Sequence, residues 1–432
     1  MPDTWLIEPS GPLVGDVHIR GAKNSVTKHM VAALLATSPS VIKNVPVVGD
    51  VAITAEMLQH LGVGVERVGS TLTITPTRTL NSEVPLFFTG LNRIPILLLG
   101  PLLHARQEAF VPRVGGDRIG GRPVDFHVTA LRALGAEVTV TEEGISARAA
   151  KLHGARIELP YPSVGATESI MLTAVLSEGT TVIYNAAVEP EVIELALFLQ
   201  RMGAGIELQP DRRVIIEGVR ELKGASVTLE GDRIEAFSYL VAGLLSGGNV
   251  RVFGCSQDRL VTAINTLRRM GAHFNITDQY VSARAVNGLR PAAVQTDTHP
   301  GFMTDWQTPT LVLMTQADGL SVLHETVFEN RLIYVNALKQ FGCEMEVFPA
   351  CLGGRACRFH DTNHLHSVVV RGKCKLQGAV VEVPDLRAGF SSVLAAAIAG
   401  DASALHGVRH LERGYEDPKG RLGSIGLKIT IA

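Results

Sequence analysis

Seven basic residues lie in turn-forming segments between predicted helices and strands, not on helix faces. They are Lys23, Arg93, Arg122, Arg233, Arg331, Arg387 and Arg413. Each one alone is typical of a solvated surface charge. Arginine also binds carboxylate and phosphate through paired hydrogen bonds, so cations gathered in one place would suit a small substrate that carries both groups. The set predicts an anion-binding site, and the solvated-charge alternative stays open for each member.

Two aspartates also lie in turns. Asp117 is surrounded by four glycines in the segment "VPRVGGDRIGGRPVDFH". It is either part of an ordinary Gly-Asp surface turn or the acid on a lid that closes over a site. Asp305 follows the turn at Pro300 and precedes an apolar helix. It either stabilises the N-terminus of that helix or serves as a general base toward a substrate hydroxyl.

The elements that must position these residues repeat six times. Each copy has a helical apolar segment, an apolar residue with a glycine, and an alternating strand-like run. The glycines that mark the copies are Gly62, Gly135, Gly203, Gly271, Gly342 and Gly426. We expect each glycine to end its helix with a positive φ angle, and the run after it to form a strand with one buried face.

A second motif interleaves with the first, with an apolar helix, a turn and a β-branched strand in each copy. The stretch "LLLGPLLHARQEAFV" is its degenerate copy. These units are longer than usual solenoid repeats, so we expect them to close three to a domain, leaving a cleft between two α/β domains. The last interval is the longest, and we assign its excess, Ala350 to His366, to a surface loop in the sixth unit.

Composition excludes several classes of function. The formal charge of −2 gives no field for nucleic acid or an anionic membrane, and the apolar run from Ile94 to Leu103 is too short for a span. The N-terminal residues do not resemble a signal peptide. The five cysteines leave one unpaired and have no CxxC spacing, so we expect a reduced cytoplasmic setting and no metal site. The alternative is a metal bound by Cys351 and Cys357 with nearby histidines, namely His360, His364 and His366.

Ordered motifs along essentially the whole chain carry a resemblance to a known family. They are "GAKN" from Gly21, "GGxxIGxRPVDxH" from Gly115, "SVGAT" from Ser163, "DRIE" from Asp232, "FxTDxQ" from Phe302, "ETVFENR" from Glu325, "DLRA" from Asp385 and "RGYE" from Arg413. On these the chain resembles the UDP-N-acetylglucosamine 1-carboxyvinyltransferases, a family of enolpyruvyl transferases. The resemblance implies two inside-out α/β-barrel-like domains of three repeated units each, with the active site in the interdomain cleft. The implied domains are residues 1–21 with 233–432, and residues 22–232, which carry the lid.

The implied activity moves the enolpyruvyl group of phosphoenolpyruvate to the 3-hydroxyl of UDP-N-acetylglucosamine and releases phosphate, the first committed step of peptidoglycan precursor synthesis. No cofactor, metal, nucleic-acid partner or membrane partner is implied. The phosphoenolpyruvate ligands would be Lys23, Arg122 and Arg387, with Arg93, Arg331 and Arg413 completing the cationic wall. The sugar ligands would be Asn24, Asp305 and Val327. The uracil ligands would be Arg122, Pro123, Asp125 and Phe126. The diphosphate ligands would be Ser163, Val164 and Gly165. The catalytic groups would be Asp117, Asp305 and Lys23, with Asp305 as the base.

The sequence departs from the family pattern in three places. Asp117 stands where many members have a cysteine, which predicts resistance to fosfomycin because that drug alkylates the cysteine. Tyr161 stands where many members have a lysine near the nucleotide. The apolar segment around Arg93 and the insert from Ala350 to His366 leave the acceptor open. The alternatives are a transferase for another uridine nucleotide in specialised metabolism, one for shikimate 3-phosphate (which the "RPVDFH" and "SVGAT" motifs oppose), and a catalytically silent paralogue that binds UDP-sugar.

Overall fold

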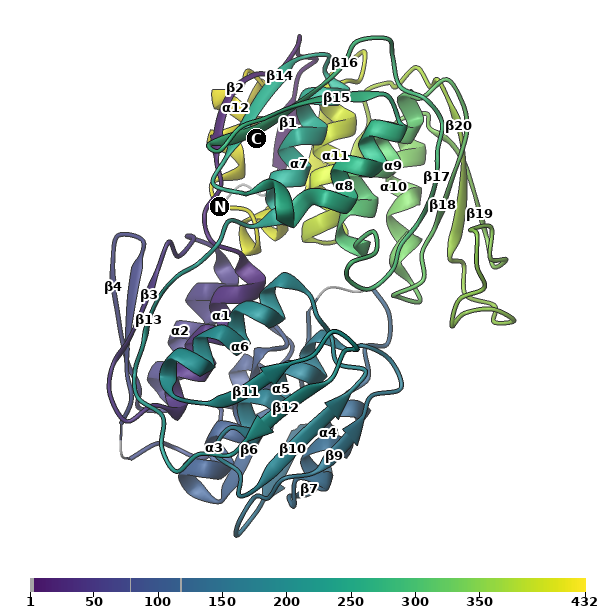
Figure 1. The fold of residues 1–432 in the computed structure, drawn as a ribbon. Helices are drawn as coiled ribbons and strands as arrows, with labels where there is room; N and C mark the ends of the chain where they lie inside the picture. The colour runs from purple at the N-terminus through teal and green to yellow at the C-terminus, as the bar shows by residue number, and fades with distance from the viewer. Residues whose placement is uncertain (1–3, 78, 117–118) are drawn as a thin grey trace. The chain divides into compact units, whose positions relative to one another are not determined.

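The computed structural model describes residues 4–77, 79–116 and 119–432, and the chain forms two compact units (Figure 1). We define the first unit as the described residues among 1–20, 117–122 and 231–432, and the second unit as those among 21–116 and 123–230. The predicted domains, with limits at 21/22 and 232/233, stay a prediction, because compactness alone does not show that either part folds independently.

The second unit contains three sheets and six α-helices. Its sheets have the strand orders β13-β3-β5-β4, β6-β8-β7 and β11-β12-β10-β9. The strands are β3 (Ser40–Lys43), β4 (Gly64–Val68), β5 (Thr71–Thr75), β6 (Glu108–Pro112), β7 (Glu137–Val140), β8 (Gly144–Arg148), β9 (Arg156–Glu158), β10 (Thr180–Tyr184), β11 (Gly205–Leu208), β12 (Val214–Glu217) and β13 (Ser226–Thr228). The helices are α1 (Lys23–Ala32), α2 (Gly49–His60), α3 (Leu99–Arg106), α4 (Asp125–Ala133), α5 (Val164–Ala174) and α6 (Pro190–Met202).

The first unit also contains three sheets and six α-helices. Its sheets have the strand orders β15-β16-β14-β2, β17-β18-β20-β19 and β21-β22-β1-β23. The strands are β1 (Thr4–Ile7), β2 (Val14–His18), β14 (Asn249–Phe253), β15 (Ala272–Ile276), β16 (Tyr280–Ala285), β17 (Ala293–Gln295), β18 (Gly319–His324), β19 (Glu344–Phe348), β20 (Ser367–Gly372), β21 (Val380–Glu382), β22 (Ser403–His406) and β23 (Ile429–Ile431). The helices are α7 (Arg233–Leu245), α8 (Val261–Arg269), α9 (Gln307–Gln316), α10 (Val335–Gln340), α11 (Leu386–Ala397) and α12 (Pro418–Ser424).

Helices form the centre of the first unit and sheets its outside. Helices α7, α9 and α11 are buried almost all round and pack against one another (Figure 1). A helix that is apolar on every face must be buried, whereas a strand with alternating burial, such as β14, covers a core with one face only. This arrangement confirms the predicted α/β class with helices inside. None of the described helices is long and apolar enough to cross a membrane.

The six predicted repeats correspond to six small sheets, five of which are mixed. All six marker glycines have positive φ angles, between 85° and 109°, at the ends of their helices, as predicted. In five sheets one edge strand pairs in parallel and the other neighbours pair antiparallel, for example β2 with β14. The three-stranded sheet β6-β8-β7 has only an isolated parallel bridge, between Glu83 and Phe110, in place of that edge strand. Its strand β6 overlaps the end of the segment that the sequence identifies as the degenerate copy.

The predicted place of the insertion is wrong by one unit. The segment from Ala350 to His366 connects β19 to β20 and therefore belongs to the fifth sheet. The sixth sheet is completed by the N-terminal strand β1, which pairs with β22 and β23. Counting from the marker glycine alone placed the loop in the last repeat, because the spacing of glycines does not show which strands pair.

Candidate active site

Asp305 lies in the first unit beside a buried arginine. It belongs to the 3-10 turn Thr304–Trp306 that precedes α9, and its side chain is 20% exposed. Nη2 of Arg331 donates to its Oδ1 at 2.9 Å. Arg331 is almost fully buried, and its Nη1 lies 3.9 Å from a carboxylate oxygen of Asp385. Buried charges are stable only when paired, so the two aspartates balance the charge of Arg331 and fix its orientation.

Arg387 lies in the first turn of α11, two residues after Asp385. The side chain of Asp385 caps this helix by accepting from the backbone N–H groups of Arg387 and Ala388 at 2.8 and 2.9 Å. The guanidinium of Arg387 lies over the ring of Tyr415 at 5.2 Å. Burial lowers the pKa of Arg387, but Tyr415, Asp232 and Asp305 outweigh that effect and raise it above its usual range. The structure therefore brings three predicted residues together in the first unit, namely Asp305, Arg331 and Arg387.

Glu325 is a functional candidate that the sequence analysis quoted only as part of a motif. It is fully buried, and its Oε1 accepts from the backbone N–H groups of Val327 and Phe328 at 2.6 and 2.9 Å. Its Oε2 accepts from the hydroxyl of Thr304 at 2.9 Å and from the side-chain amide of Gln307. Burial raises the pKa of Glu325. One carboxylate thus joins the segment of Asp305 to the turn that carries Val327.

Arg122 and Arg413, which the sequence also predicts, belong to the first unit. Arg122 has a positive φ of 44°, and its guanidinium lies 5.9 Å from the ring centroid of Phe328. The carbonyl of Ile119 accepts from the backbone N–H of Asn330. Arg413 ends the 3-10 helix Val408–Arg413 and is half-buried. The predicted acid Asp117 lies outside the described residues.

The second unit positions Lys23 at the first residue of α1. Its Nζ lies 2.6 Å from a carboxylate oxygen of Asp50, the second residue of α2, and both side chains are largely buried. The adjacent Asn24 accepts from Nζ of Lys28 through its backbone carbonyl at 2.7 Å. Nζ of Lys28 is 4.0 Å from Glu168 on α5. Burial raises the pKa of Glu168 to about 7.

Arg93 lies close to the segment predicted to bind uracil. Its Nη2 donates to the carbonyl of Pro123 at 3.3 Å. Burial, and then the charge of Arg93, lower the pKa of His127 to about 3, so its imidazole is neutral. Asp125 and Phe126 form the first turn of α4, with Asp125 exposed and Phe126 packed against the core.

The N-terminus of α5 carries the residues predicted to bind diphosphate. Ser163 caps this helix and accepts from the backbone N–H of Ala166 at 3.3 Å. Val164 and Gly165 supply the first backbone N–H groups, and a helix N-terminus favours anions. A Cβ atom at Gly165 would come within 3.1 Å of Nε2 of His127, so a glycine lets the helix pass this buried ring.

Two further residues of these groups, Asp385 and Asp50, were assigned no role from the sequence. Asp385 precedes an apolar helix and could have been identified by its capping position. Asp50 had no such signal, because its pairing with Lys23 depends on how α1 and α2 pack.

Comparisons with known proteins show what the chain is similar to. Residues 7–422 match the family described as EPSP synthase (3-phosphoshikimate 1-carboxyvinyltransferase). The chain is 42% identical to UDP-N-acetylglucosamine 1-carboxyvinyltransferase of Protochlamydia amoebophila, over 99% of this chain and 94% of that protein. It is 41% identical to the enzyme with the same name from Acidiphilium cryptum, over 99% of both chains.

Two solved structures share the fold. The enolpyruvyl transferase NikO from Streptomyces tendae superposes with a TM-score of 0.87 at 24% identity, over 99% of each chain. EPSP synthase from Acinetobacter baumannii superposes with a TM-score of 0.77 at 17% identity, again over 99% of each chain. At these identities the likeness shows the fold, and the identification of the family rests on the sequence matches.

Proposed function

Because the chain belongs to the UDP-N-acetylglucosamine 1-carboxyvinyltransferase family of enolpyruvyl transferases, we propose that it transfers the enolpyruvyl group of phosphoenolpyruvate to the 3-hydroxyl of UDP-N-acetylglucosamine. The products are the 3-enol ether of the nucleotide sugar and inorganic phosphate, and the reaction opens peptidoglycan precursor synthesis. The observation that carries the assignment of roles is the contact between Asp305 and the buried Arg331. It supplies a base and a fixed cation at one place.

Asp305 is the base in this proposal. Its Oδ1 is held by Arg331, and within the described part of the chain its Oδ2 accepts no hydrogen bond from a protein group. Oδ2 can therefore take the proton of the 3-hydroxyl, while the fixed Oδ1 keeps the carboxylate oriented. The sugar oxygen then attacks C2 of phosphoenolpyruvate. Asn24 and Val327 complete the contacts with the sugar.

The cations stabilise the charge that moves during the reaction. Lys23, Arg122 and Arg387 bind the carboxylate and phosphate of phosphoenolpyruvate. The supporting cations are Arg93, Arg331 and Arg413. Buried guanidinium groups such as Arg387 are held by their partners before substrate arrives, so they need little reorganisation during the reaction.

Asp117 is the acid in this proposal. It protonates C3 of phosphoenolpyruvate while the oxygen attacks C2, which gives a tetrahedral phospholactoyl intermediate. Loss of a C3 proton and of phosphate then restores the double bond as an enol ether. An aspartate at this place carries no thiol for fosfomycin to alkylate, so we propose that the enzyme resists that drug.

The nucleotide is bound by two segments of the second unit. Uracil contacts come from Pro123, Asp125 and Phe126, together with Arg122. The diphosphate is bound by Ser163, Val164 and Gly165, where backbone N–H groups at the start of α5 replace the charge that Tyr161 does not supply.

The test is phosphate release by the purified protein with phosphoenolpyruvate and three acceptors in parallel, namely UDP-N-acetylglucosamine, UMP and shikimate 3-phosphate. We expect release with the nucleotide sugar alone, and its loss in Asp305→Ala. Release with UMP alone would reject the acceptor and keep the reaction. A folded protein that binds UDP-N-acetylglucosamine but releases no phosphate would be a silent paralogue.

A further inference from the structure

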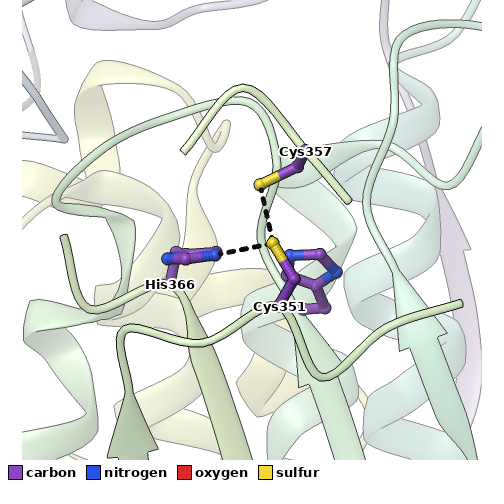
Figure 2. A group of neighbouring side chains, drawn as sticks. Cys351, Cys357 and His366 are labelled. Carbon is purple, nitrogen blue, oxygen red and sulfur yellow. Dashed lines mark hydrogen bonds between the residues drawn. The ribbon is translucent and has the colours of Figure 1, made fainter. Parts of the chain in front are cut away.

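A cluster of two cysteines and two histidines lies at one end of the sheet β17-β18-β20-β19. Figure 2 shows Cys351, Cys357 and His366 pointing toward one another. One ligand atom from each of these residues and from His324 can be chosen so that all four lie within 4.8 Å of one another. None of these four residues is among the predicted catalytic or substrate-binding residues.

Two distances in this cluster match those of a tetrahedral metal site. The Sγ atoms of Cys351 and Cys357 are 3.6 Å apart, and Sγ of Cys351 is 3.4 Å from Nε2 of His366. Zinc–sulfur bonds of about 2.3 Å and zinc–nitrogen bonds of about 2.0 Å place ligand atoms about 3.3 to 3.8 Å apart in a tetrahedron. The two sulfur atoms are much farther apart than the roughly 2.05 Å of a disulfide.

The hydrogen bonds around the cluster orient its atoms for a metal. Nδ1 of His366 lies 2.7 Å from the carbonyl of His364, so it carries the proton and leaves the Nε2 lone pair directed at the cluster. The backbone N–H of Phe359 donates to Sγ of Cys357 at 3.3 Å. Outer hydrogen bonds of these two kinds fix the imidazole tautomer and stabilise a thiolate at metal sites.

His324 favours a metal site over a simple pair of thiol hydrogen bonds. Its side chain is fully buried, and neither ring nitrogen has a hydrogen-bond partner among the residues that the structure describes. A buried polar atom without a partner costs about 1–3 kcal/mol. A thiol hydrogen bond from Cys351 to His366 would leave that loss in place, whereas a metal takes up one nitrogen of His324.

The sheet positions the histidines, and a loop positions the cysteines. His324 ends β18 and pairs in register with Ser367, the first residue of β20, so His324 and His366 are at the same end of two hydrogen-bonded strands. Cys351 and Cys357 belong to the loop that follows β19. A Cβ atom at Gly353 would clash with the ring of His324, so a glycine lets this loop lie against the histidine.

We propose that His324, Cys351, Cys357 and His366 bind one zinc ion, which fastens the loop between β19 and β20 to the end of its sheet. Two thiolates and two imidazoles are a typical set of ligands for a structural zinc site, and two thiolates balance the charge of Zn²⁺. His360 and His364, which the sequence placed near the cysteines, are not ligands. His360 lies 3.4 Å from Asp361, and His364 acts through its carbonyl.

The fastened loop also reaches the predicted active-site segments of the first unit. Arg358, one residue after Cys357, donates to a carboxylate oxygen of Glu329 at 2.9 Å. Glu329 also lies against Gly120, and its neighbour Asn330 donates to Ile119. Zinc therefore fixes Arg358 and, through it, the turn between Val327 and Arg331.

The experiment measures zinc in the full-length protein, expressed with zinc in the medium and purified with a thiol reductant. Elemental analysis gives the metal content, and replacement of zinc by Co²⁺ gives a visible spectrum that reports tetrahedral thiolate coordination. The variants are Cys351→Ser combined with Cys357→Ser, and His324→Gln. The matched control is Cys374→Ser, since Cys374 lies outside the cluster and donates to the carbonyl of Arg371.

We expect one zinc ion per chain in the wild type and in Cys374→Ser, with loss of zinc and of the cobalt spectrum in the double variant. Removing zinc from the wild type with a chelator should speed amide hydrogen exchange in residues 349–366, which tests the proposal even if a variant fails to fold. A folded, reduced wild type that binds neither zinc nor cobalt would overturn the proposal. Retention of zinc by the double variant would also overturn it.

Discussion

Replacing Glu325 by alanine should loosen the turn that carries Val327 and Phe328. The substitution removes a fully buried carboxylate that accepts from two backbone N–H groups, those of the half-buried Val327 and Phe328. Each hydrogen bond of this kind contributes about 1–3 kcal/mol, so the local opening free energy should fall by about 2–6 kcal/mol. Because about 1.4 kcal/mol corresponds to a factor of ten, these two amides should exchange with solvent at least about 30-fold faster.

The assay is hydrogen exchange of the peptide covering residues 325–331, followed by mass spectrometry. Glu325→Gln is the matched control, because its amide oxygen can still accept from both backbone N–H groups while its NH₂ meets the donors Thr304 and Gln307. We expect the exchange rate of Glu325→Gln to lie between those of the wild type and Glu325→Ala. The KM for UDP-N-acetylglucosamine should rise in the same order. Unchanged exchange in Glu325→Ala would refute the view that this carboxylate holds the turn.

Three further predictions concern the drug, the phosphoenolpyruvate site and pH. Fosfomycin should not inactivate the wild type irreversibly, whereas Asp117→Cys should become sensitive to the drug. Activity measured after dialysis tests this: the wild type should regain its activity and Asp117→Cys should not. Lasting inactivation of the wild type would contradict the proposal. Arg387→Lys keeps the charge but loses the planar group over Tyr415. The KM for phosphoenolpyruvate should therefore rise about 10- to 100-fold, which corresponds to a loss of about 1.5–3 kcal/mol of binding free energy. An unchanged KM would exclude Arg387 from the phosphoenolpyruvate site. Glu168 has a folded pKa of about 7 against 4.5 unfolded, so the folded chain binds more protons between these pH values and its contribution to stability is lost as pH rises through about 7. The free energy of unfolding of the wild type should fall by about 3 kcal/mol between pH 4.5 and 8, and Glu168→Gln should not show this fall. Urea unfolding at several pH values measures it, and identical pH profiles for both proteins would contradict the prediction.

Much of the fold could be predicted from the sequence because it depends on local pattern. A glycine after an apolar helix ends that helix through its own backbone freedom, and all six marker glycines do so. An apolar helix such as α7 is buried whatever it packs against. The place of the insertion was wrong because strand pairing is not local, and β1, from the start of the chain, completes the last sheet.

Only the residues of the candidate site that belong to a sequence motif could be predicted from the sequence. Lys23, Asp305, Arg331 and Arg387 stand in motifs with a recognisable pattern, whereas their fixing partners are set by packing. Asp50 meets Lys23 only because two helices meet, and His324 meets the cysteines only because β18 and β20 are paired. No spacing rule along the chain connects such residues.

The most direct test of the central claim is the product formed from phosphoenolpyruvate and UDP-N-acetylglucosamine in D₂O, analysed by mass spectrometry and proton NMR. Addition followed by elimination turns C3 into a methyl group before a proton is lost, so we expect a 3-enol ether with deuterium on its methylene carbon. Asp305→Ala should form no such product. An undeuterated ether would contradict the mechanism, and a phosphorylated sugar with free pyruvate would contradict enolpyruvyl transfer itself.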